Sequence, residues 1–168
     1  MLRSKKCVFV SHCLLAQITV AKGLAKTSPA MAKQVVQFCM DNDINIFQMP
    51  CPEIHCEAGG VERELHGKKW YEDNGLRTTG KQIAKEQVCY MKRMIDSGAN
   101  ILAVIGVEFS PACAPTYLNK GRSIVRSKGI YIEELIAELK FQGLKIPIVG
   151  INQRWHRKVQ KQLNELLE

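Results

Sequence analysis

The chain has 168 residues, of which 46% are apolar and 24% charged, a composition typical of one folded domain with a sizeable core rather than of a disordered protein. It carries 24 Lys and Arg against 16 Asp and Glu, and the resulting formal net charge of +8 favours acidic partners. The basic residues are spread along the chain, however, which favours an ordinary solvated surface over a dedicated nucleic-acid patch.

The N-terminal segment and the cysteines indicate the compartment. The segment has a basic start, but its apolar run is short and broken by Ser11 and His12, unlike that of a signal peptide. No apolar stretch is long enough to span a bilayer. The seven cysteines are odd in number and scattered, unlike the disulfide framework of a small secreted protein. We therefore predict a cytoplasmic protein that does not insert into a membrane.

Four short apolar runs, rich in Val and Ile, recur along the chain. Near-continuous apolar runs of this length are typical of parallel strands that are buried on both faces. The sequence therefore predicts four strands, over residues 7–12, 44–49, 101–107 and 146–151.

Helical patterns separate these runs. Ser28 and Pro29 have the residue types of an N-cap and a first-turn proline, so a helix is expected to begin there and to end near Asp41. Later apolar stripes with helical spacing predict three more helices, over residues 79–97, 132–143 and 155–166.

The alternation of strands and helices predicts the fold class. We expect a single α/β domain over residues 1–168, with an open, mostly parallel, Rossmann-like sheet of about four strands and helices on both faces. Two connections, residues 50–79 and 110–129, are long for such a fold. Both begin at the carboxyl end of a predicted strand, and long loops in a compact domain tend to carry function.

Three cysteines follow predicted strands directly. Cys13, Cys51 and Cys113 stand at the carboxyl ends of the first three strands, where open α/β sheets bind their ligands. The other cysteines have positions typical of structural thiols, at the start of a strand or inside helices: Cys7, Cys39 and Cys89. Cys56 lies a few residues into the connection over residues 50–79 and could join the first group.

Thiolates that converge in a reducing compartment indicate a soft-metal site, either an iron–sulfur cluster or zinc. Three thiolates leave one coordination position open for a substrate, whereas four, with Cys56 as the fourth, would form a closed site in a non-catalytic module. A third interpretation is that strand ends merely tolerate cysteine and that the crevice binds a phosphorylated small molecule. No glycine-rich phosphate loop follows the first strand, where Gly23 stands alone.

The residues around the three cysteines resemble the motifs of the thiouracil desulfidase family. The motifs are Cys13-Leu14-Leu15, Cys51-Pro52-Glu53 and Ser110-Pro111-Ala112-Cys113, in matching order, spacing and structural context. The resemblance extends over roughly the whole chain, as a single-domain version of the family. It implies that the three cysteines bind a [4Fe–4S] cluster whose fourth iron has no protein ligand and takes the sulfur of a thiolated pyrimidine.

The chain also departs from the family pattern. Where relatives continue the first motif with an Arg-Tyr-Asp-Gly-like segment, residues 16–20 read Ala-Gln-Ile-Thr-Val. The usual lysine three residues before the serine of the third motif is Val107, and the glycine after the third cysteine is Ala114. The chain therefore resembles a diverged branch, to which the cluster transfers more safely than the substrate.

The resemblance implies a hydrolytic enzyme without net redox chemistry. The open iron would act as a Lewis acid on the sulfur of thiouracil, thiouridine or a related thioamide, so that water adds to the adjacent carbon. Glu53 or Glu108 would steer protons, and Ser110 would hydrogen-bond the substrate or relay a proton. Thiolated tRNA is a less supported substrate, and the oligomeric state, including a homo-oligomer, is left open. His12 and His55 flank two of the cysteines and could donate to the substrate or to cluster sulfurs.

Overall fold

A four-stranded parallel sheet forms the centre of the computed structural model, which describes residues 2–25, 27–56 and 59–168. The spatial order of the strands is β2-β1-β3-β6, and each neighbouring pair is parallel. These strands confirm the predicted α/β class and its open sheet, with bounds close to those expected: β1 (Lys6–Val10), β2 (Asn45–Gln48), β3 (Asn100–Val107) and β6 (Ile148–Ile151).

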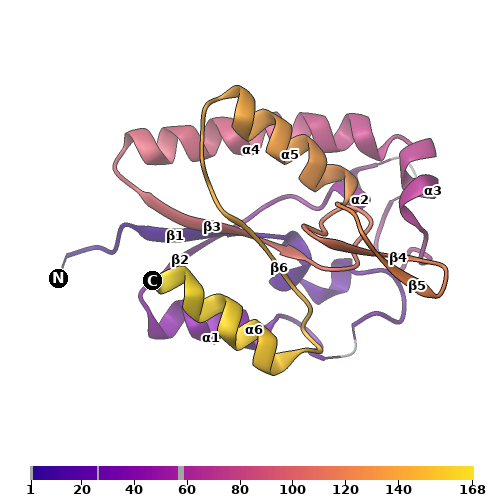
Figure 1. Ribbon diagram of the computed structural model, residues 1–168, viewed down its shortest axis with the longest axis horizontal. Helices are drawn as coiled ribbons and strands as arrows, with labels where there is room; N and C mark the ends of the chain where they lie inside the picture. Colours follow the sequence, from indigo (N-terminus) through magenta and orange to yellow (C-terminus); the bar gives the residue numbers. More distant parts are fainter. Residues whose placement is uncertain (1, 26, 57–58) are drawn as a thin grey trace.

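Helices cover both faces of this sheet, as predicted (Figure 1). One face carries α4 (Leu76–Asp96) and α5 (Ile130–Phe141), and the other carries α1 (Lys33–Asp41) and α6 (His156–Asn164). Two short helices, α2 (Pro52–His55) and α3 (Lys68–Asp73), lie near the carboxyl end of the strands. Within the described residues, no helix is long and apolar enough to cross a bilayer.

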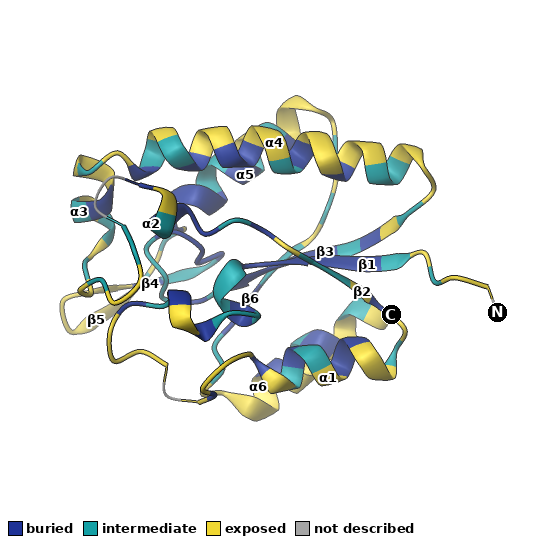
Figure 2. Cartoon of the chain, turned by 180° about the vertical axis from the view of Figure 1, so that it is seen from behind, coloured by how far each residue is buried: buried dark blue, intermediate teal, exposed yellow. Residues whose placement is uncertain are grey.

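The sheet separates two apolar cores. Side chains alternate between the faces of a strand, so Phe9 and Val104 enter the core beneath α4 and α5. Val10 and Ile105 enter the core beneath α1 and α6. Figure 2 shows the same division, with the buried faces of the helices turned toward the sheet and the exposed faces turned outward. Burial on both faces explains why these strands read as continuous apolar runs.

The order of the strands creates a switch point. From β1 the chain passes to β2 on one side, and it then crosses to β3 on the other side of β1. The segments that leave β1 and β3 therefore diverge at the carboxyl end of the sheet. A crevice opens at such a point, and it is the place where α/β sheets bind ligands.

The start of α1 differs from the prediction, because the helix begins at Lys33 and not at Ser28 and Pro29. The segment before it is engaged in tertiary hydrogen bonds instead: the Gln17 N–H donates to the Ala30 carbonyl, and the Ala32 N–H donates to the Leu14 carbonyl, both at 2.7 Å. These bonds tie the segment to the loop after β1. Local capping chemistry was therefore outweighed by a contact that the local pattern does not contain.

The two long connections contain regular structure that the sequence pattern did not predict. The first includes α2 and α3, and α4 begins at Leu76 rather than Thr79. The second includes a hairpin of β4 (Tyr117–Lys120) and β5 (Ser123–Arg126). Its two-residue turn begins with Gly121, whose φ of 61° suits the first central position of a type II′ turn. The strands are short and largely exposed, so they have no apolar alternation to reveal them.

Gly106 in β3 allows the segment that carries Cys113 to pack directly onto the sheet. A methyl group at this position would overlap the Cys113 carbonyl oxygen and would lie 2.8 Å from Pro115 Cγ. The Val107 N–H donates to the same carbonyl at 3.1 Å. The backbone of β3 thus supports the segment that carries Cys113.

Replacing Gly106 by Ala should lower the free energy of unfolding by about 1–3 kcal/mol, because the Cys113 segment must move to admit the methyl group. Gly80 provides a matched control within α4, since a methyl group there would make only an ordinary contact of 3.5 Å with Tyr131. Gly80→Ala should leave stability unchanged or raise it by up to about 1 kcal/mol. Urea unfolding of both variants measures the difference, and equal losses would contradict the packing argument.

Candidate functional site

A cavity of about 270 Å³ lies at the carboxyl ends of the sheet strands. The segments that follow β1, β2, β3 and β6 all contribute to its wall, so it occupies the switch point of the sheet. The residues that the motif resemblance assigns to the metal or to catalysis all line this one cavity: Cys13, Cys51, Glu53, Glu108, Ser110 and Cys113. The fold brings together residues that lie on three separate loops.

The three cysteines are free thiols that lie close enough to influence one another's protonation. Burial raises the pKa of Cys13 to about 12, and the nearby charges of Cys51 and Glu53 add to this effect. Burial also raises the pKa of Cys113 well above its ordinary value, with further contributions from Cys13 and Cys51. Such thiols become thiolates when a bound metal supplies the compensating positive charge.

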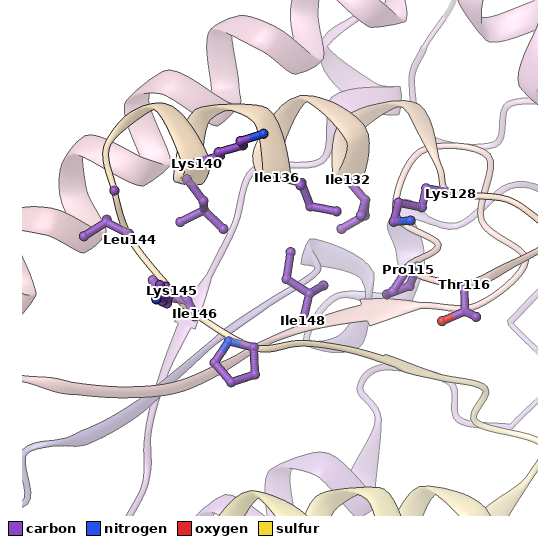
Figure 3. A pocket seen from close by; sticks show the side chains of 13 residues that line it. Pro115, Thr116, Lys128, Ile132, Ile136, Lys140, Leu144, Lys145, Ile146 and Ile148 are labelled. Atoms are coloured by element: carbon purple, nitrogen blue, oxygen red, sulfur yellow. The ribbon is translucent and has the colours of Figure 1, made fainter.

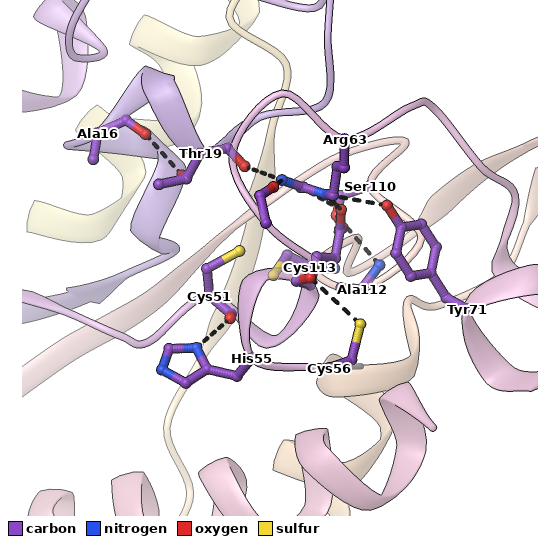
Figure 4. Close-up of polar contacts among 12 residues, drawn as sticks. Ala16, Thr19, Cys51, His55, Cys56, Arg63, Tyr71, Ser110, Ala112 and Cys113 are labelled. Atoms are coloured by element: carbon purple, nitrogen blue, oxygen red, sulfur yellow. Dashed lines mark hydrogen bonds and ion pairs between the residues drawn. The ribbon is translucent and has the colours of Figure 1, made fainter. Parts of the chain in front are cut away.

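Glu53 is held in the wall of the cavity by a buried ion pair with Arg63, whose side chain is labelled in Figure 4. Arg63 donates to Glu53 Oε2 from Nη2 at 2.5 Å and from Nε at 3.1 Å. The side chains are only 7% and 9% exposed. Burial alone lowers the pKa of Arg63, but the charge of Glu53 and the hydrogen bonds outweigh it and raise that pKa. Arg63 therefore stays positively charged in the wall of the cavity.

Arg63 also connects separate segments of the wall. Its Nη1 donates to the Thr19 carbonyl at 2.6 Å and to the Gly60 carbonyl at 3.1 Å, and its Nε lies 3.1 Å from the Tyr71 hydroxyl. Burial raises the pKa of Tyr71 to about 12, and the charge of Glu53 contributes to the rise. Tyr71 therefore stays a neutral phenol at physiological pH.

Ser110 shapes the turn that presents Cys113. Its Oγ accepts hydrogen bonds from the backbone N–H groups of Cys113 at 2.9 Å and Ala112 at 3.3 Å. The same hydroxyl donates to Glu53 Oε1 at 3.3 Å. Ser110 therefore links the turn of the third cysteine to the carboxylate that follows the second. This double role gives a physical reason for a serine three residues before the cysteine.

Glu108 is engaged differently from Glu53. Its Oε2 accepts hydrogen bonds from the backbone N–H groups of Thr116 at 3.2 Å and Tyr117 at 2.8 Å. These bonds fix the return of the loop into β4. Glu108 lines the cavity, but this carboxylate oxygen is occupied by the backbone of its own loop.

Between Glu108 and Ser110, Phe109 adopts a left-handed backbone conformation with a φ of 68°. Such a conformation is strained for an aromatic residue and occurs most often at functional sites. The backbone N–H of Phe109 donates to the Tyr117 carbonyl at 2.9 Å. Its ring meets Trp155 edge to face, with centroids 5.6 Å apart. The backbone and the side chain of Phe109 are thus both held in place by contacts.

The three other sequence candidates have different positions. His12 lines the cavity, and its Nδ1 lies 3.2 Å from the Met49 carbonyl oxygen. His55 is exposed, and its Nδ1 lies 2.8 Å from the Cys51 carbonyl oxygen. Cys56 is buried in the apolar core beneath α4 and α5, and its thiol donates to the Glu53 carbonyl at 3.4 Å. Neither His55 nor Cys56 is among the described residues of the cavity wall.

Three thiols that line one cavity are the type of ligand that soft metals and iron–sulfur clusters take. Among the described residues, no group of three or more His, Cys, Asp or Glu is arranged to hold a single metal ion. A cluster has a different requirement, because each thiolate binds a different iron and the sulfurs stand farther apart. The buried Ser11 hydroxyl lines the same cavity beside Cys113, and its hydrogen bond to that thiol opposes the rise in the Cys113 pKa. Cluster sulfides accept hydrogen bonds, so this hydroxyl would also suit a cluster.

Sequence reasoning missed several residues of the site. Arg63 stands in a loop where acidic and basic residues are mixed, and no local pattern distinguishes it from its charged neighbours. The cavity is also lined by Asn119 from the hairpin and by residues 152–154 after β6, none of which the sequence marked as a candidate. Arg63 was identified by its burial and its partner, and the other residues by their position in the cavity wall, all of which depend on the folded chain.

Comparisons with known proteins give little indication of the family to which this chain belongs. No protein-family model matches it, and no solved structure matches it significantly. A protein of Methanocaldococcus jannaschii described as uncharacterized is 25% identical over 169 residues, a match that covers 99% of this chain and 100% of the relative. The similarity therefore extends over nearly the full length of both sequences.

Removing the Arg63 charge, as in Arg63→Met, should lower the free energy of unfolding by about 3–5 kcal/mol, because Glu53 would remain buried without its partner. Lys22 provides the control, since its ion pair with Glu64 joins side chains that are 64% and 72% exposed. Lys22→Met should cost less than about 1 kcal/mol. Chemical denaturation measures both, and a cost for Arg63→Met as small as that for Lys22→Met would contradict the role given to the buried pair.

Proposed function

We propose that this protein is a [4Fe–4S]-dependent desulfidase that removes sulfur hydrolytically, without net redox chemistry, from a small thiolated pyrimidine such as thiouracil or thiouridine. The observation that supports this function most is the convergence of Cys13, Cys51 and Cys113 in one cavity with Glu53 and Ser110. The motif resemblance supplies the substrate class, and the geometry supports the assignment of roles.

The three thiols would hold the cluster, and Ser11 would donate a hydrogen bond to it or to the substrate. When bound, such a cluster supplies one iron without a protein ligand, a Lewis acid suited to a thiocarbonyl sulfur. The position of Cys56 supports an open site rather than a closed four-thiolate one. Its thiol bonds the Glu53 carbonyl and packs in the core, so it would have to leave that environment to become a fourth ligand.

The reaction exchanges the sulfur of a carbon–sulfur double bond for the oxygen of water. Hydrosulfide is the leaving group, and nothing is oxidised or reduced. Glu53 would accept a proton from the attacking water and return it to the departing sulfur. Arg63 would hold this carboxylate in one orientation through Oε2, which leaves Oε1 directed toward Ser110. Ser110 would orient the substrate through the hydroxyl that it now shares with Glu53.

The first test is cluster content. After anaerobic reconstitution, the wild-type chain should hold about four iron and four acid-labile sulfide per protein, and Cys51→Ala should lose most of both because one of three ligands is gone. Cys89→Ala is the control, since Cys89 is exposed on α4 away from the cavity, and it should retain full content. Metal analysis also separates iron from zinc. Iron that is absent, or indifferent to Cys51, would overturn the proposal.

The second test separates the two carboxylates. Glu53→Gln should lower the rate of sulfide release from thiouracil or thiouridine by about 10²–10⁴-fold, because an amide cannot accept the proton. Glu108→Gln should have a much smaller effect, since the amide oxygen can still accept from Thr116 and Tyr117. Because Glu53→Gln also removes the charge that Arg63 pairs with, the rates of both variants are compared per bound iron. A larger loss in Glu108→Gln would reverse the assignment of the base.

A further inference from the structure

A second hollow lies on the face of the molecule that carries α5, outside the candidate site. This α5–β6 groove has a volume of about 610 Å³ and is lined by 13 residues (Figure 3). Six aliphatic side chains form most of its wall: Ile132, Ile136, Leu139, Leu144, Ile146 and Ile148. Figure 3 shows Ile132 and Ile136 descending from α5 toward Ile148, which rises from the strand below.

The groove exists because the sheet ends at β6. This strand pairs with β3 on one side only, so no further strand within the described residues extends the sheet beneath α5. Ile136, Leu144, Ile146 and Ile148 are consequently only partly buried, although they pack against the core. Their exposed apolar surface would gain stabilisation from an apolar occupant.

The charges around the groove are of one sign. Lys128, Lys140 and Lys145 line it, and no Asp or Glu does among the described residues. None of the three lysines forms an ion pair within the part of the chain that the structure describes, whereas six other cationic side chains do: Lys22, Arg63, Lys68, Lys69, Arg77 and Lys161. Lysine stems extend an apolar wall while their amines remain at the rim. The groove therefore combines an apolar interior with a cationic edge.

Size and charge together narrow the choice of occupant. A protein interface of standard size uses roughly 20–30 residues on each side, more than the 13 that line this groove. A second copy is disfavoured further, because a symmetric contact would place these lysines against their own counterparts in a chain of net charge +8. A volume of about 610 Å³ lies within the ordinary range for a small-molecule ligand.

We propose that the α5–β6 groove is a binding site for a free apolar anion, a molecule with an extended hydrocarbon body and a carboxylate or similar head. The body would lie between α5 and residues 146–148, and the head would meet a lysine amine at one end of the groove, since Lys128 and Lys145 lie at opposite ends (Figure 3). The site is separate from the cysteine cavity. Pro115 and Thr116, which close one end of the groove, follow Cys113 by two and three residues, so the two sites share a chain segment.

Decanoate, kept below the concentration at which it forms micelles, is a suitable probe. In protein labelled at isoleucine methyl groups, it should shift the NMR signals of Ile132, Ile136 and Ile148, and leave those of distant isoleucines such as Ile18 and Ile44 in place. Decan-1-ol and decyltrimethylammonium should bind at least about tenfold more weakly, because they lack the negative head group.

A triple variant tests the lysines. Lys128→Gln, Lys140→Gln and Lys145→Gln together should weaken decanoate binding at least about tenfold. The matched control removes three exposed lysines from α4, as Lys81→Gln, Lys85→Gln and Lys92→Gln, and should leave the affinity within about twofold. The methyl spectra of both variants report whether the fold is retained.

Three results would overturn the assignment. One is the absence of any groove shift with decanoate up to about 1 mM. Another is binding of decan-1-ol as tight as that of decanoate, or equal weakening in the two lysine variants. The third is binding to phosphatidylglycerol vesicles without any response to free decanoate, which would make this surface a membrane contact. None of these measurements requires an iron–sulfur cluster, so they are independent of the proposed enzyme activity.

Discussion

The buried ion pair between Arg63 and Glu53 is the interaction on which the geometry of the candidate site depends. One guanidinium reaches Thr19 on the loop after β1 and Glu53 after β2, and through Glu53 it reaches Ser110 after β3. Each of these loops carries one of the three cysteines. A charge is costly to bury alone, so each partner requires the other in place. The relative positions of the three loops therefore depend on the ion pair between Arg63 and Glu53.

The same charges bear on the chemistry of the cavity. Three thiols and a carboxylate line one cavity, and burial together with neighbouring charges raises the pKa values of Cys13 and Cys113. Thiols with raised pKa values stay protonated and neutral, so Arg63 balances the charge of Glu53. Deprotonation of the three thiols would require a cationic centre among them, which is what the proposed cluster would supply.

Much of the fold was predictable because the sheet is buried on both faces. The core strands can be recognised in the sequence as continuous apolar runs. Cys13, Cys51 and Cys113 follow these runs in the sequence, so their position at the carboxyl ends of the strands was predictable as well. The hairpin of β4 and β5 was not predictable, because its strands are short and exposed. The start of α1 was wrong for a different reason, since backbone bonds to the loop after β1 displaced the local preference of Ser28 and Pro29.

The sequence by itself determined the α/β class, the order of strands and helices, and the three cysteine positions, because periodicity and spacing are local properties. Only the tertiary structure decided which charged residues matter. Arg63 is one of 24 Lys and Arg, and nothing in its neighbours indicates that it alone is buried against Glu53. The different partners of Glu53 and Glu108, and the position of Cys56 outside the cavity wall, likewise depend on where side chains point after folding. Burial and partnership arise between distant segments, so the local pattern could not contain them.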